Sequence, residues 1–413
     1  MQSNKHSLKL LLRNTSWLVG AEVVAKATRL LSIMAMAAFL VPVEYGAAML
    51  ALSIHEVIRL LLRSGTGAQI IRAKDSDLPD YLSNGLCIQW LLCVALCLVQ
   101  LMTAYATQWL FPEHDITTLV ALMAFTYLVF PMVSTRAFLV QRDNRMALFS
   151  MISSCCIILE NTTIAVALYF DAGLLAIVYA KWAFALLWLG AFSLVDTLPH
   201  KIGFKRDTFF YLLGSSTQLA AAEGLRSLRM NMDIFIGARL LSPELFGLYS
   251  FAKSAGIGLA MSISQAYITA LYPYVCQQQE NAQTGNLNQK IMWVTAAVSA
   301  IFVCQSVLVP VYVPLLFSAD WQASFTTTSL LCLIAITTVW SDTYSAILRS
   351  KGLFKVETQQ CAYCLIVSTI GVLAIAPQQP DTFALVLLLS SILWLVFPAI
   401  NVLLVKFSAI KAA

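Results

Sequence analysis

Long hydrophobic stretches alternate with short polar gaps along the chain, from Leu10 to Val405. A helix that crosses a bilayer needs about 20 mostly apolar residues, and most of these stretches reach that length. The pattern therefore predicts about twelve transmembrane helices. We expect them near residues 14–40, 46–63, 84–110, 116–139, 147–170, 173–195, 208–240, 245–274, 290–317, 323–347, 356–376 and 382–405.

The gaps between the predicted spans alternate in charge. Odd-numbered gaps carry acids and no Lys or Arg, as at Glu113 and Asp115, whereas even-numbered gaps and both ends carry the bases, as at Arg142 and Arg145. The positive-inside rule places the bases in the cytoplasm. Both termini are then cytoplasmic, which requires an even number of spans. The net charge of +5 is explained by this basic cytoplasmic side and implies no nucleic-acid partner.

Composition agrees with an all-α, polytopic membrane protein. Hydrophobic residues make up 59% of the chain and charged residues 11%, whereas soluble domains contain roughly 25% charged residues. A cleaved signal peptide is not expected at the N-terminus, because its apolar stretch is too long and contains three charged residues. No phosphate loop, metal cluster or nucleophile–base pair is visible, so we expect no cofactor, no metal and no enzyme activity.

A repeated motif indicates that the chain is a duplicated half. Leu40-Val-Pro-Val-Glu-Tyr-Gly46 returns as Leu241-Ser-Pro-Glu-Leu-Phe-Gly247, 201 residues later. Each half has the same predicted sidedness, which describes a parallel repeat about an axis along the membrane normal. We predict two pseudo-symmetric six-helix lobes, residues 1–200 and 201–413. Secondary transporters built in this way hold their substrate between the lobes near the bilayer midplane.

Charged residues within the predicted spans are the strongest functional signal. The first span of each half carries such a set: Glu22, Lys26 and Arg29 in the first, and Glu223, Arg226, Arg229 and Asp233 in the seventh. Further charges within spans are His55 if protonated, Glu56, Arg59, Arg136, Glu160, Lys181, Lys253 and Asp342. Charges at such depth are costly and usually face a cavity or one another.

Two interpretations of these charges remain open. Neighbours such as Glu22 and Lys26 could be structural pairs on one helix face. The set nevertheless contains more bases than acids, and unpaired cations in a dry interior are unfavourable. An anionic substrate would account for the excess, because one phosphate oxygen about 4 Å from an Arg gains about 4 kcal/mol at an effective dielectric constant near 20.

Several segments resemble the Wzx-type polysaccharide and O-antigen flippases of the MOP superfamily, which also contains the MATE transporters. The resemblance rests on Asn231-x-Asp-Ile-Phe-Ile-Gly237 followed by Leu241-Ser-Pro-x-x-x-Gly-Leu-Tyr-Ser-Phe-Ala252, and on Asn14-Thr-Ser-Trp17 and Leu40-x-Pro-x-x-Tyr-Gly46 near the start. It covers essentially the whole chain. The fold that it implies is two six-helix lobes around a central cavity. The two additional C-terminal spans of the lipid II flippase branch are not predicted here.

The resemblance implies a function. Such a protein flips an oligosaccharide on undecaprenyl pyrophosphate from the cytoplasmic to the periplasmic leaflet of the bacterial inner membrane, for O-antigen, capsule or exopolysaccharide synthesis. It uses a gradient of H⁺ or Na⁺ and works beside a polysaccharide polymerase and a chain-length regulator. The cationic residues expected to bind the pyrophosphate or an anionic glycan are Lys26, Arg29, Arg59, Arg226 and Arg229. The acids expected to couple ion movement are Glu22, Glu160, Glu223 and Asp233.

Two other classes of function were weighed. A MATE-type multidrug or cation antiporter would share the fold, but it requires an acidic cavity, and the excess of bases argues against it. A membrane-embedded glycan polymerase or ligase requires a sizeable exterior loop or a cluster of acids or His at one membrane face. The predicted exterior gaps are short and the four His residues are scattered, which makes this class the least favoured.

Overall fold

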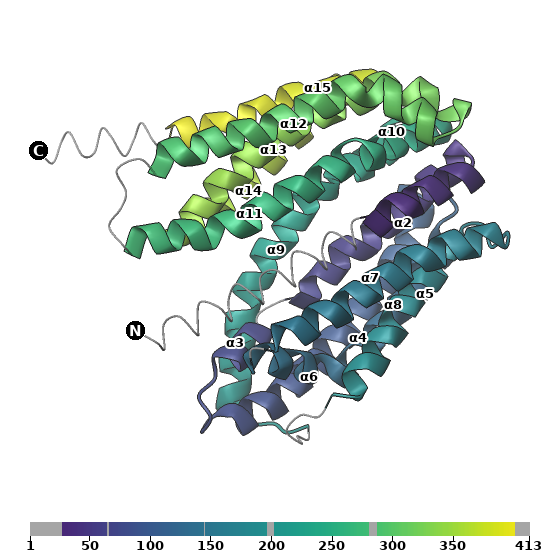
Figure 1. The fold of residues 1–413 in the computed structure, drawn as a ribbon. Helices are drawn as coiled ribbons and strands as arrows, with labels where there is room; N and C mark the ends of the chain where they lie inside the picture. The colour runs from purple at the N-terminus through teal and green to yellow at the C-terminus, as the bar shows by residue number, and fades with distance from the viewer. Residues whose placement is uncertain (1–26, 64–65, 144, 196–201, 281–286, 401–413) are drawn as a thin grey trace, which may run out of the picture. The chain divides into compact units, whose positions relative to one another are not determined.

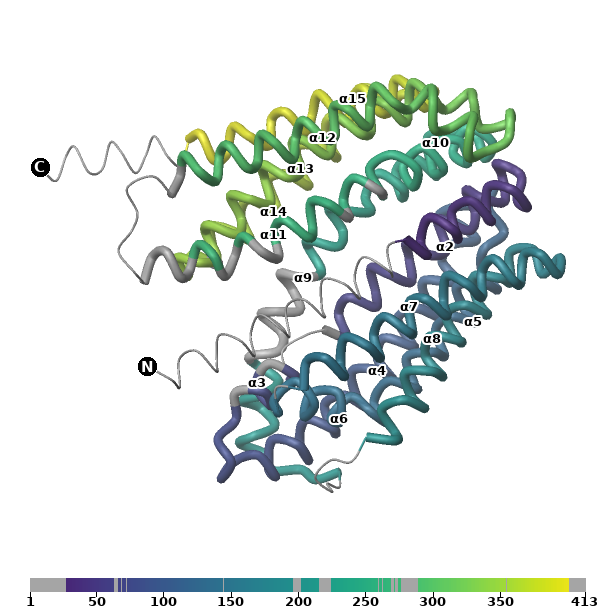
Figure 2. The backbone as a smooth tube through the Cα atoms, in the orientation of Figure 1, coloured from purple at the N-terminus to yellow at the C-terminus, as the bar shows by residue number. Residues whose placement is uncertain are grey.

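The chain folds into helices throughout the part that the structure describes. This computed structural model describes residues 27–63, 66–143, 145–195, 202–280 and 287–400 (Figures 1 and 2). Side chains at some further positions, including 215–223 within one long helix, are also outside the description. Within these described ranges there are α-helices, short 3₁₀ helices and turns, and no strand. The chain separates into two compact units.

Unit 1 comprises Met1–Leu40 together with Ala47–Ser227. Its helices are Ala27–Phe39, α2 (Pro42–Leu60, from residue 47), η1 (Leu61–Arg63), α3 (Thr66–Arg72), α4 (Leu78–Leu110), α5 (Thr117–Ala124), η2 (Phe125–Leu128), α6 (Pro131–Arg142), α7 (Met146–Tyr169), α8 (Leu175–Ser193) and the first part of α9 (Arg206–Leu240). Helices α7 and α8 pack along each other, and α4 packs against α5 (Figure 1). The short helix α3, which the hydrophobic pattern did not predict, packs against α4 and α6.

Unit 2 comprises Val41–Gly46 together with Leu228–Ala413. Its helices are the rest of α9, α10 (Pro243–Ala255), α11 (Ile257–Glu280), α12 (Leu287–Leu316), η3 (Ala319–Ser324), α13 (Phe325–Ser350), α14 (Phe354–Ile375), α15 (Pro380–Ile392) and η4 (Leu393–Leu395). Helix α13 lies at the centre of this unit, in contact with α11, α12 and α15. Several of its Thr side chains are buried and donate hydrogen bonds to the backbone of the same helix, as Thr338 does to the Ile334 carbonyl.

Two spans that were predicted as single helices are broken. The stretch expected at 116–139 is α5, η2 and α6, and it bends by 58° between Leu128 and Pro131. Proline lacks the N–H that an α-helix requires and its ring crowds the preceding turn. The helix therefore tightens to 3₁₀ at η2 and restarts at Pro131, which is a correction to the straight span.

The second break lies at Gly256, inside the span expected at 245–274. Helix α10 ends before this residue and α11 begins after it. Two side chains of α12 donate to backbone carbonyls at the break: Tyr312 to the Ala255 carbonyl at 3.1 Å, and Gln305 to the Gly256 carbonyl at 3.0 Å. A span can be interrupted where other side chains bind the freed backbone groups in this way.

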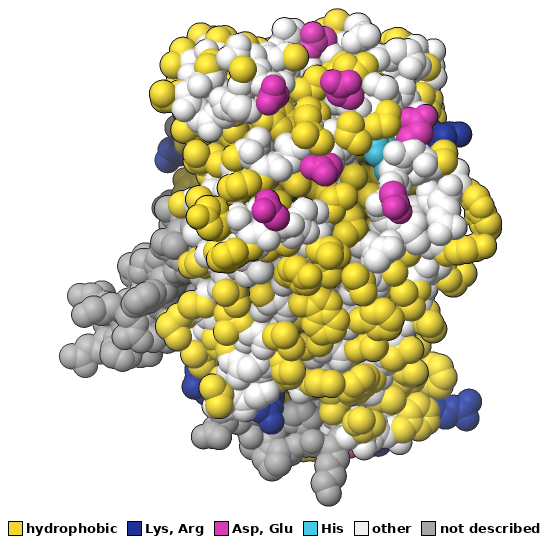
Figure 3. Space-filling view, turned by 90° about the vertical axis from the view of Figure 1, so that its right-hand side faces the viewer, with side chains coloured by type: hydrophobic (Ala, Val, Ile, Leu, Met, Phe, Trp, Pro, Cys, Tyr) yellow, Lys and Arg dark blue, Asp and Glu magenta, His cyan; other side chains and the backbone are white. Residues whose placement is uncertain are grey.

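The composition of the helices fits a membrane protein. Seven described helices are long and apolar enough to cross a membrane, or eight if the bent α5–α6 pair is one span. The charged helices α2 and α9 are not among them. Figure 3 shows hydrophobic side chains over most of the drawn face, and most of the Asp and Glu side chains in its upper part. Such an extended apolar surface is expected where lipid, not water, is the solvent.

The boundary between the units differs from the predicted lobe boundary at 200/201. It falls between Ser227 and Leu228, inside α9. The beginning of α9 belongs with unit 1 because Phe209 and Leu212 pack against Ile88 of α4. Polar contacts at 202–206, next to the predicted lobe boundary, reinforce this attachment. The side chain of Lys205 donates to Asp80 at 2.5 Å.

The two copies of the repeated motif lie against each other in unit 2. A Cβ on Gly46 would come within 3.1 Å of the Gly247 Cα, and a Cβ on Gly247 would overlap the carbonyl group of Pro42. Tyr45 packs beside this contact with its ring 5.2 Å from that of Trp321. The first residues of α2 therefore belong to unit 2, although the rest of the helix belongs to unit 1.

Candidate functional site

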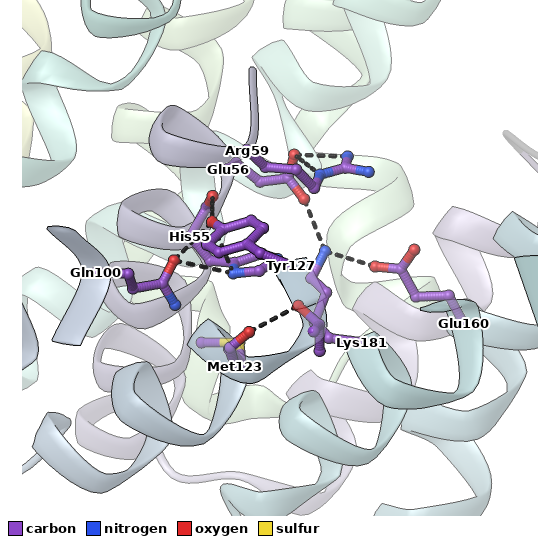
Figure 4. Close-up of polar contacts among 9 residues, drawn as sticks. His55, Glu56, Arg59, Gln100, Met123, Tyr127, Glu160 and Lys181 are labelled. Atoms are coloured by element: carbon purple, nitrogen blue, oxygen red, sulfur yellow. Dashed lines mark hydrogen bonds and ion pairs between the residues drawn. The ribbon is translucent and has the colours of Figure 1, made fainter. Parts of the chain in front are cut away.

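Helix α2 carries three neighbouring polar residues into the interior of unit 1: His55, Glu56 and Arg59. Glu56 and Arg59 are one helical turn apart, a spacing at which side chains meet on one helix face. Arg59 donates from Nε and Nη2 to Glu56 Oε2, at 3.1 and 2.7 Å. The Arg59 guanidinium also lies over the ring of Phe184 in α8, 5.6 Å from its centroid. Figure 4 shows the contacts between Arg59 and Glu56.

Lys181 connects the α2 carboxylate to a second carboxylate. Its Nζ donates to Glu56 Oε1 at 2.7 Å and to Glu160 Oε1 at 2.6 Å (Figure 4). The three residues come from α8, α2 and α7 respectively, so the ammonium joins three helices. Helix α7 contains no Lys or Arg, so a base for Glu160 has to come from another helix. Lys181 is that base.

A neutral network lies beside the charged residues. The rings of His55 and Tyr127 are stacked, with centroids 5.1 Å apart. The Tyr127 hydroxyl lies 2.6 Å from Gln100 Oε1 and 3.0 Å from the His55 carbonyl, two acceptors for its single proton. Gln100 in turn donates to the Val120 carbonyl at 2.8 Å. Tyr127 lies in η2, so the bend between α5 and α6 brings its side chain to the charged helix.

We call Glu56, Arg59, Glu160 and Lys181 the carboxylate–cation cluster. Its two acids and two bases cancel, so the cluster as a whole is neutral. Its two sides differ in access: the side chains of Glu56 and Arg59 are 32% and 29% exposed, whereas those of Lys181 and Glu160 are 9% and 16% exposed. The α2 side of the cluster is therefore the side that a ligand can reach.

Unit 2 contains a buried ion pair of its own. Arg229 of α9 donates from Nη2 to Asp342 Oδ1 of α13 at 3.0 Å, and its guanidinium lies 5.3 Å from the centroid of the Trp394 ring. The residue is only 6% exposed. Its Nε and Nη1 are buried and find no hydrogen-bond acceptor among the described residues. The sequence predicted Arg229 as a substrate-binding residue, and the geometry instead gives it a partner within the helix bundle.

A second pair in unit 2 involves Asp233. Lys253 of α10 donates to Asp233 Oδ1 at 2.6 Å and to the Met230 carbonyl at 2.9 Å. The Tyr249 hydroxyl donates to the other carboxylate oxygen at 2.6 Å. Two of the charged residues of the predicted seventh span, Arg229 and Asp233, are thus bound by residues of other helices.

The other predicted site residues fall into two groups. Glu22 and Lys26 are outside the described residues, and Glu223 is described only in its backbone. Arg29 is exposed and Arg226 is half-buried, and neither forms an ion pair with any side chain that the structure describes. The same part of the chain contains no group of His, Cys, Asp and Glu arranged to hold a metal ion.

Three residues that support these sites were not singled out from the sequence: Gln100, Phe184 and Trp394. Gln100 had a usable signal, because an amide within a long apolar stretch needs a hydrogen-bonding partner. The two aromatic residues had none, since aromatic side chains are common in transmembrane helices. Their roles depend on which helix lies opposite, and the hydrophobic pattern carries no such information.

Comparison with known families places these observations in context. A family model described as "Polysaccharide biosynthesis protein" matches residues 35–326. The matched region includes the carboxylate–cation cluster, the pair of Asp233 and Lys253, and Arg229. The partners of Arg229, Asp342 and Trp394, lie beyond it. The chain belongs to this family. Comparison with curated protein sequences gives no match.

Solved structures agree on the fold. A structure described as lipid II flippase MurJ, inward closed conformation, is similar with a TM-score of 0.69 and 13% identity, over 93% of this chain and 87% of that one. An inward-facing multidrug resistance MATE family transporter of the MOP superfamily has a TM-score of 0.70 and 11% identity, over 92% and 95%. A MOP superfamily transporter from Pyrococcus furiosus, described as having a binding pocket of reverse polarity, has a TM-score of 0.56 and 12% identity, over 98% and 93%. At these identities the likeness concerns the fold alone.

Proposed function

We propose that this protein flips an oligosaccharide linked to undecaprenyl pyrophosphate from the cytoplasmic to the periplasmic leaflet of a bacterial inner membrane. The observation that carries the proposal is the family match over residues 35–326 on a fold similar to that of a lipid II flippase. The pathway is O-antigen, capsule or exopolysaccharide synthesis. In it the protein works beside a polymerase and a chain-length regulator, with both of its termini in the cytoplasm.

The proposed contacts to the substrate are cationic. Arg29 and Arg226 are the best-supported described residues, because each is accessible and has no ion-pair partner among the side chains described. Lys26, three residues before Arg29 in the sequence, and Arg59 complete the set. An Arg can grip phosphate oxygens with two parallel N–H donors, which suits a diphosphate. We leave Arg229 out of the set, since its burial against Asp342 is that of a bundle-stabilising residue.

Transport against a substrate gradient needs an energy source, and we propose an H⁺ or Na⁺ gradient. The candidate coupling acids are Glu22, Glu160, Glu223 and Asp233. Glu160 and Asp233 are each bound to a lysine, so either would have to exchange that lysine for the coupling ion. A ligand changes a conformational equilibrium only by its difference in affinity for the two states. The coupling acid should therefore be one whose surroundings differ between the inward-open and outward-open states.

The experiment is mass spectrometry of lipid-linked glycans from cells in which the gene is deleted. The same cells carry wild type, Arg226→Ala, Arg226→Lys or Arg145→Ala. We expect undecaprenyl-pyrophosphate oligosaccharide to accumulate in the deletion and with Arg226→Ala, and to return to normal with wild type. Arg226→Lys keeps the charge and should restore part of the export. Arg145→Ala, an exposed cytoplasmic position, should behave as wild type.

Two outcomes would contradict the proposal. An unchanged glycan pool in the deletion strain would remove the flippase function. New sensitivity of that strain to cationic drugs, with a normal glycan pool, would favour a MATE-type antiporter, a class that the similarity to the multidrug transporter leaves open. Normal export by Arg226→Ala at equal protein level would remove only this residue from the substrate site.

A further inference from the structure

The carboxylate of Glu56 is held as an anionic ligand would be held. Three donors from two cations reach it: Arg59 Nε and Nη2 on Oε2, and Lys181 Nζ on Oε1. An Arg fork together with a Lys ammonium is a common arrangement for binding phosphate oxygens. We propose that Glu56 occupies an anion site from within the chain, and that a diphosphate must displace its carboxylate in order to bind.

The two cations are held in place independently of Glu56. Lys181 Nζ also donates to Glu160 at 2.6 Å, and the Arg59 guanidinium lies over the Phe184 ring. If the Glu56 carboxylate turns away, both donors keep a partner that fixes their position. The donors are therefore preorganised for an incoming oxyanion, which lowers the entropy lost on binding.

Access to the site agrees with displacement. The side chains of Glu56 and Arg59 are about one third exposed, and those of Lys181 and Glu160 are mostly buried. A ligand thus meets Glu56 first. Glu56 can also leave without crossing the buried half of the cluster, because its carboxylate already borders the accessible side.

The negative charge of Glu56 favours binding of a diphosphate over binding of a singly charged anion. With Glu56 in place the cluster is neutral, and without it the cluster carries one net positive charge. Glu56 is tethered to the same helix as Arg59, so its effective concentration at the site is high. A ligand with a single negative charge only replaces what Glu56 already supplies. A diphosphate brings more charge and more acceptor oxygens, so it can displace the tethered carboxylate. This inference rests on the proposed function only for the identity of the natural ligand, the diphosphate of the carrier lipid.

The test is calorimetric titration of the purified full chain in detergent with two probes, inorganic pyrophosphate and inorganic phosphate. We expect Glu56→Gln to bind pyrophosphate about tenfold more tightly than wild type, since a repulsive charge next to the bound anion is removed. We expect phosphate to gain more than pyrophosphate does, so that selectivity falls. Adding Arg59→Ala to Glu56→Gln should abolish the gain.

A matched control separates displacement from simple charge. Glu160→Gln changes the net charge by the same amount but leaves Glu56 on Arg59, and we expect a gain of about twofold or less. Equal gains in the two variants would overturn the proposal, as would equal affinities of wild type and Glu56→Gln. Glu56→Asp keeps the charge but shortens the reach to both cations, and it serves if Glu56→Gln does not fold. It should give an intermediate gain, and unchanged affinity in Glu56→Asp would then count against the proposal.

The titration can be interpreted separately from the export assay. If the purified protein shows the Glu56 effect but the deletion strain has an unchanged glycan pool, this inference stands and the proposed function is wrong. If glycan export depends on the gene but Glu56→Gln does not change the affinity for pyrophosphate, the proposed function stands and this inference is wrong.

Discussion

Gly247 of α10 lies so close to the Pro42 carbonyl of α2 that a Cβ at this position would overlap it. Pro42 belongs to the first copy of the repeated motif, and Gly247 belongs to the second copy. In the sequence, each glycine could be explained as a local turn residue. In the structure the glycine is needed for the approach of two helix ends, and a backbone atom, not a mobile side chain, limits the space.

Gly247→Ala is therefore expected to destabilise the protein by about 1–3 kcal/mol or more, since overpacking against backbone forces the helix ends apart. Thermal unfolding in detergent, followed by tryptophan fluorescence, measures the change. Gly190→Ala in α8 is the control, because nothing lies within 4 Å of a Cβ there. An alanine at that helical position should be neutral or slightly stabilising. Equal melting temperatures for the two variants would mean that the contact does not limit packing.

The buried pair of Arg229 and Asp342 gives a second prediction. Removing one partner leaves an uncompensated charge, and we expect Asp342→Asn to destabilise the protein by about 3–5 kcal/mol. Asp75→Asn is the control, since Asp75 is 94% exposed in its ion pair with Arg142. Exposed pairs contribute about 0–1 kcal/mol.

Replacing both Arg229 and Asp342 tests whether the loss of stability comes from the unpaired charge. Arg229→Met with Asp342→Leu removes both charges, and buried ion pairs replaced by apolar residues are often as stable as the original. The double variant should therefore recover most of the stability lost in Asp342→Asn. A double variant as unstable as the single one would indicate that the unsatisfied guanidinium nitrogens bind something essential.

Lys181 allows a third prediction, because one ammonium holds two carboxylates on different helices. Lys181→Met leaves Glu56 with Arg59 and leaves Glu160 without its base, so we expect a loss of about 3–5 kcal/mol. Adding Glu160→Gln removes the stranded charge and should restore a large part of the loss. A double-mutant cycle on melting temperature measures the coupling. Additive effects would show that the contact between Lys181 and Glu160 has no energetic role.

The contact of Lys205 with Asp80 makes a prediction about pH. The hydrogen bond from Lys205 to the Asp80 carboxylate, with its charge, raises the pKa of Lys205 above the ordinary value. Stability from a raised lysine pKa is fully present below the unfolded-state pKa near 10.4 and is lost as pH rises through the higher folded value. The melting-temperature difference between wild type and Lys205→Gln should be constant from about pH 6 to pH 9 and shrink above about pH 10. A difference that grew with pH would contradict the assigned contact.

The sequence predicted the helices better than their partners. Apolar length and charge alternation are local properties, so the helical stretches and the broken spans' outer limits follow from them. The pair of Glu56 and Arg59 is also local, one turn apart on α2. Lys181 and Glu160 are separated by 21 residues and meet only because α7 and α8 pack along each other. Periodicity identifies the face on which a charge lies, but not the helix opposite.

The breaks and the unit boundary were missed for different reasons. Gly256 and Pro131 were visible in the sequence, but a glycine or proline within an apolar stretch is compatible with both a straight and a broken helix. The polar segment 202–206 lies next to the predicted lobe boundary at 200/201. In the structure its polar groups bind α4, and Lys205 donates its backbone N–H to Asn84 at 2.8 Å. Polarity shows that a segment is near water and does not show that it is unattached.

Residues Val41–Gly46 belong to the first half of the sequence but pack in unit 2. A chain divided after residue 200 or 227 would leave these six residues, with the Gly46 contact and the Tyr45 ring, on the fragment that forms unit 1. The other fragment would fold around a gap that only its sister fragment can fill. A fragment that begins after residue 227 would therefore lack part of the packing that unit 2 has in the whole chain.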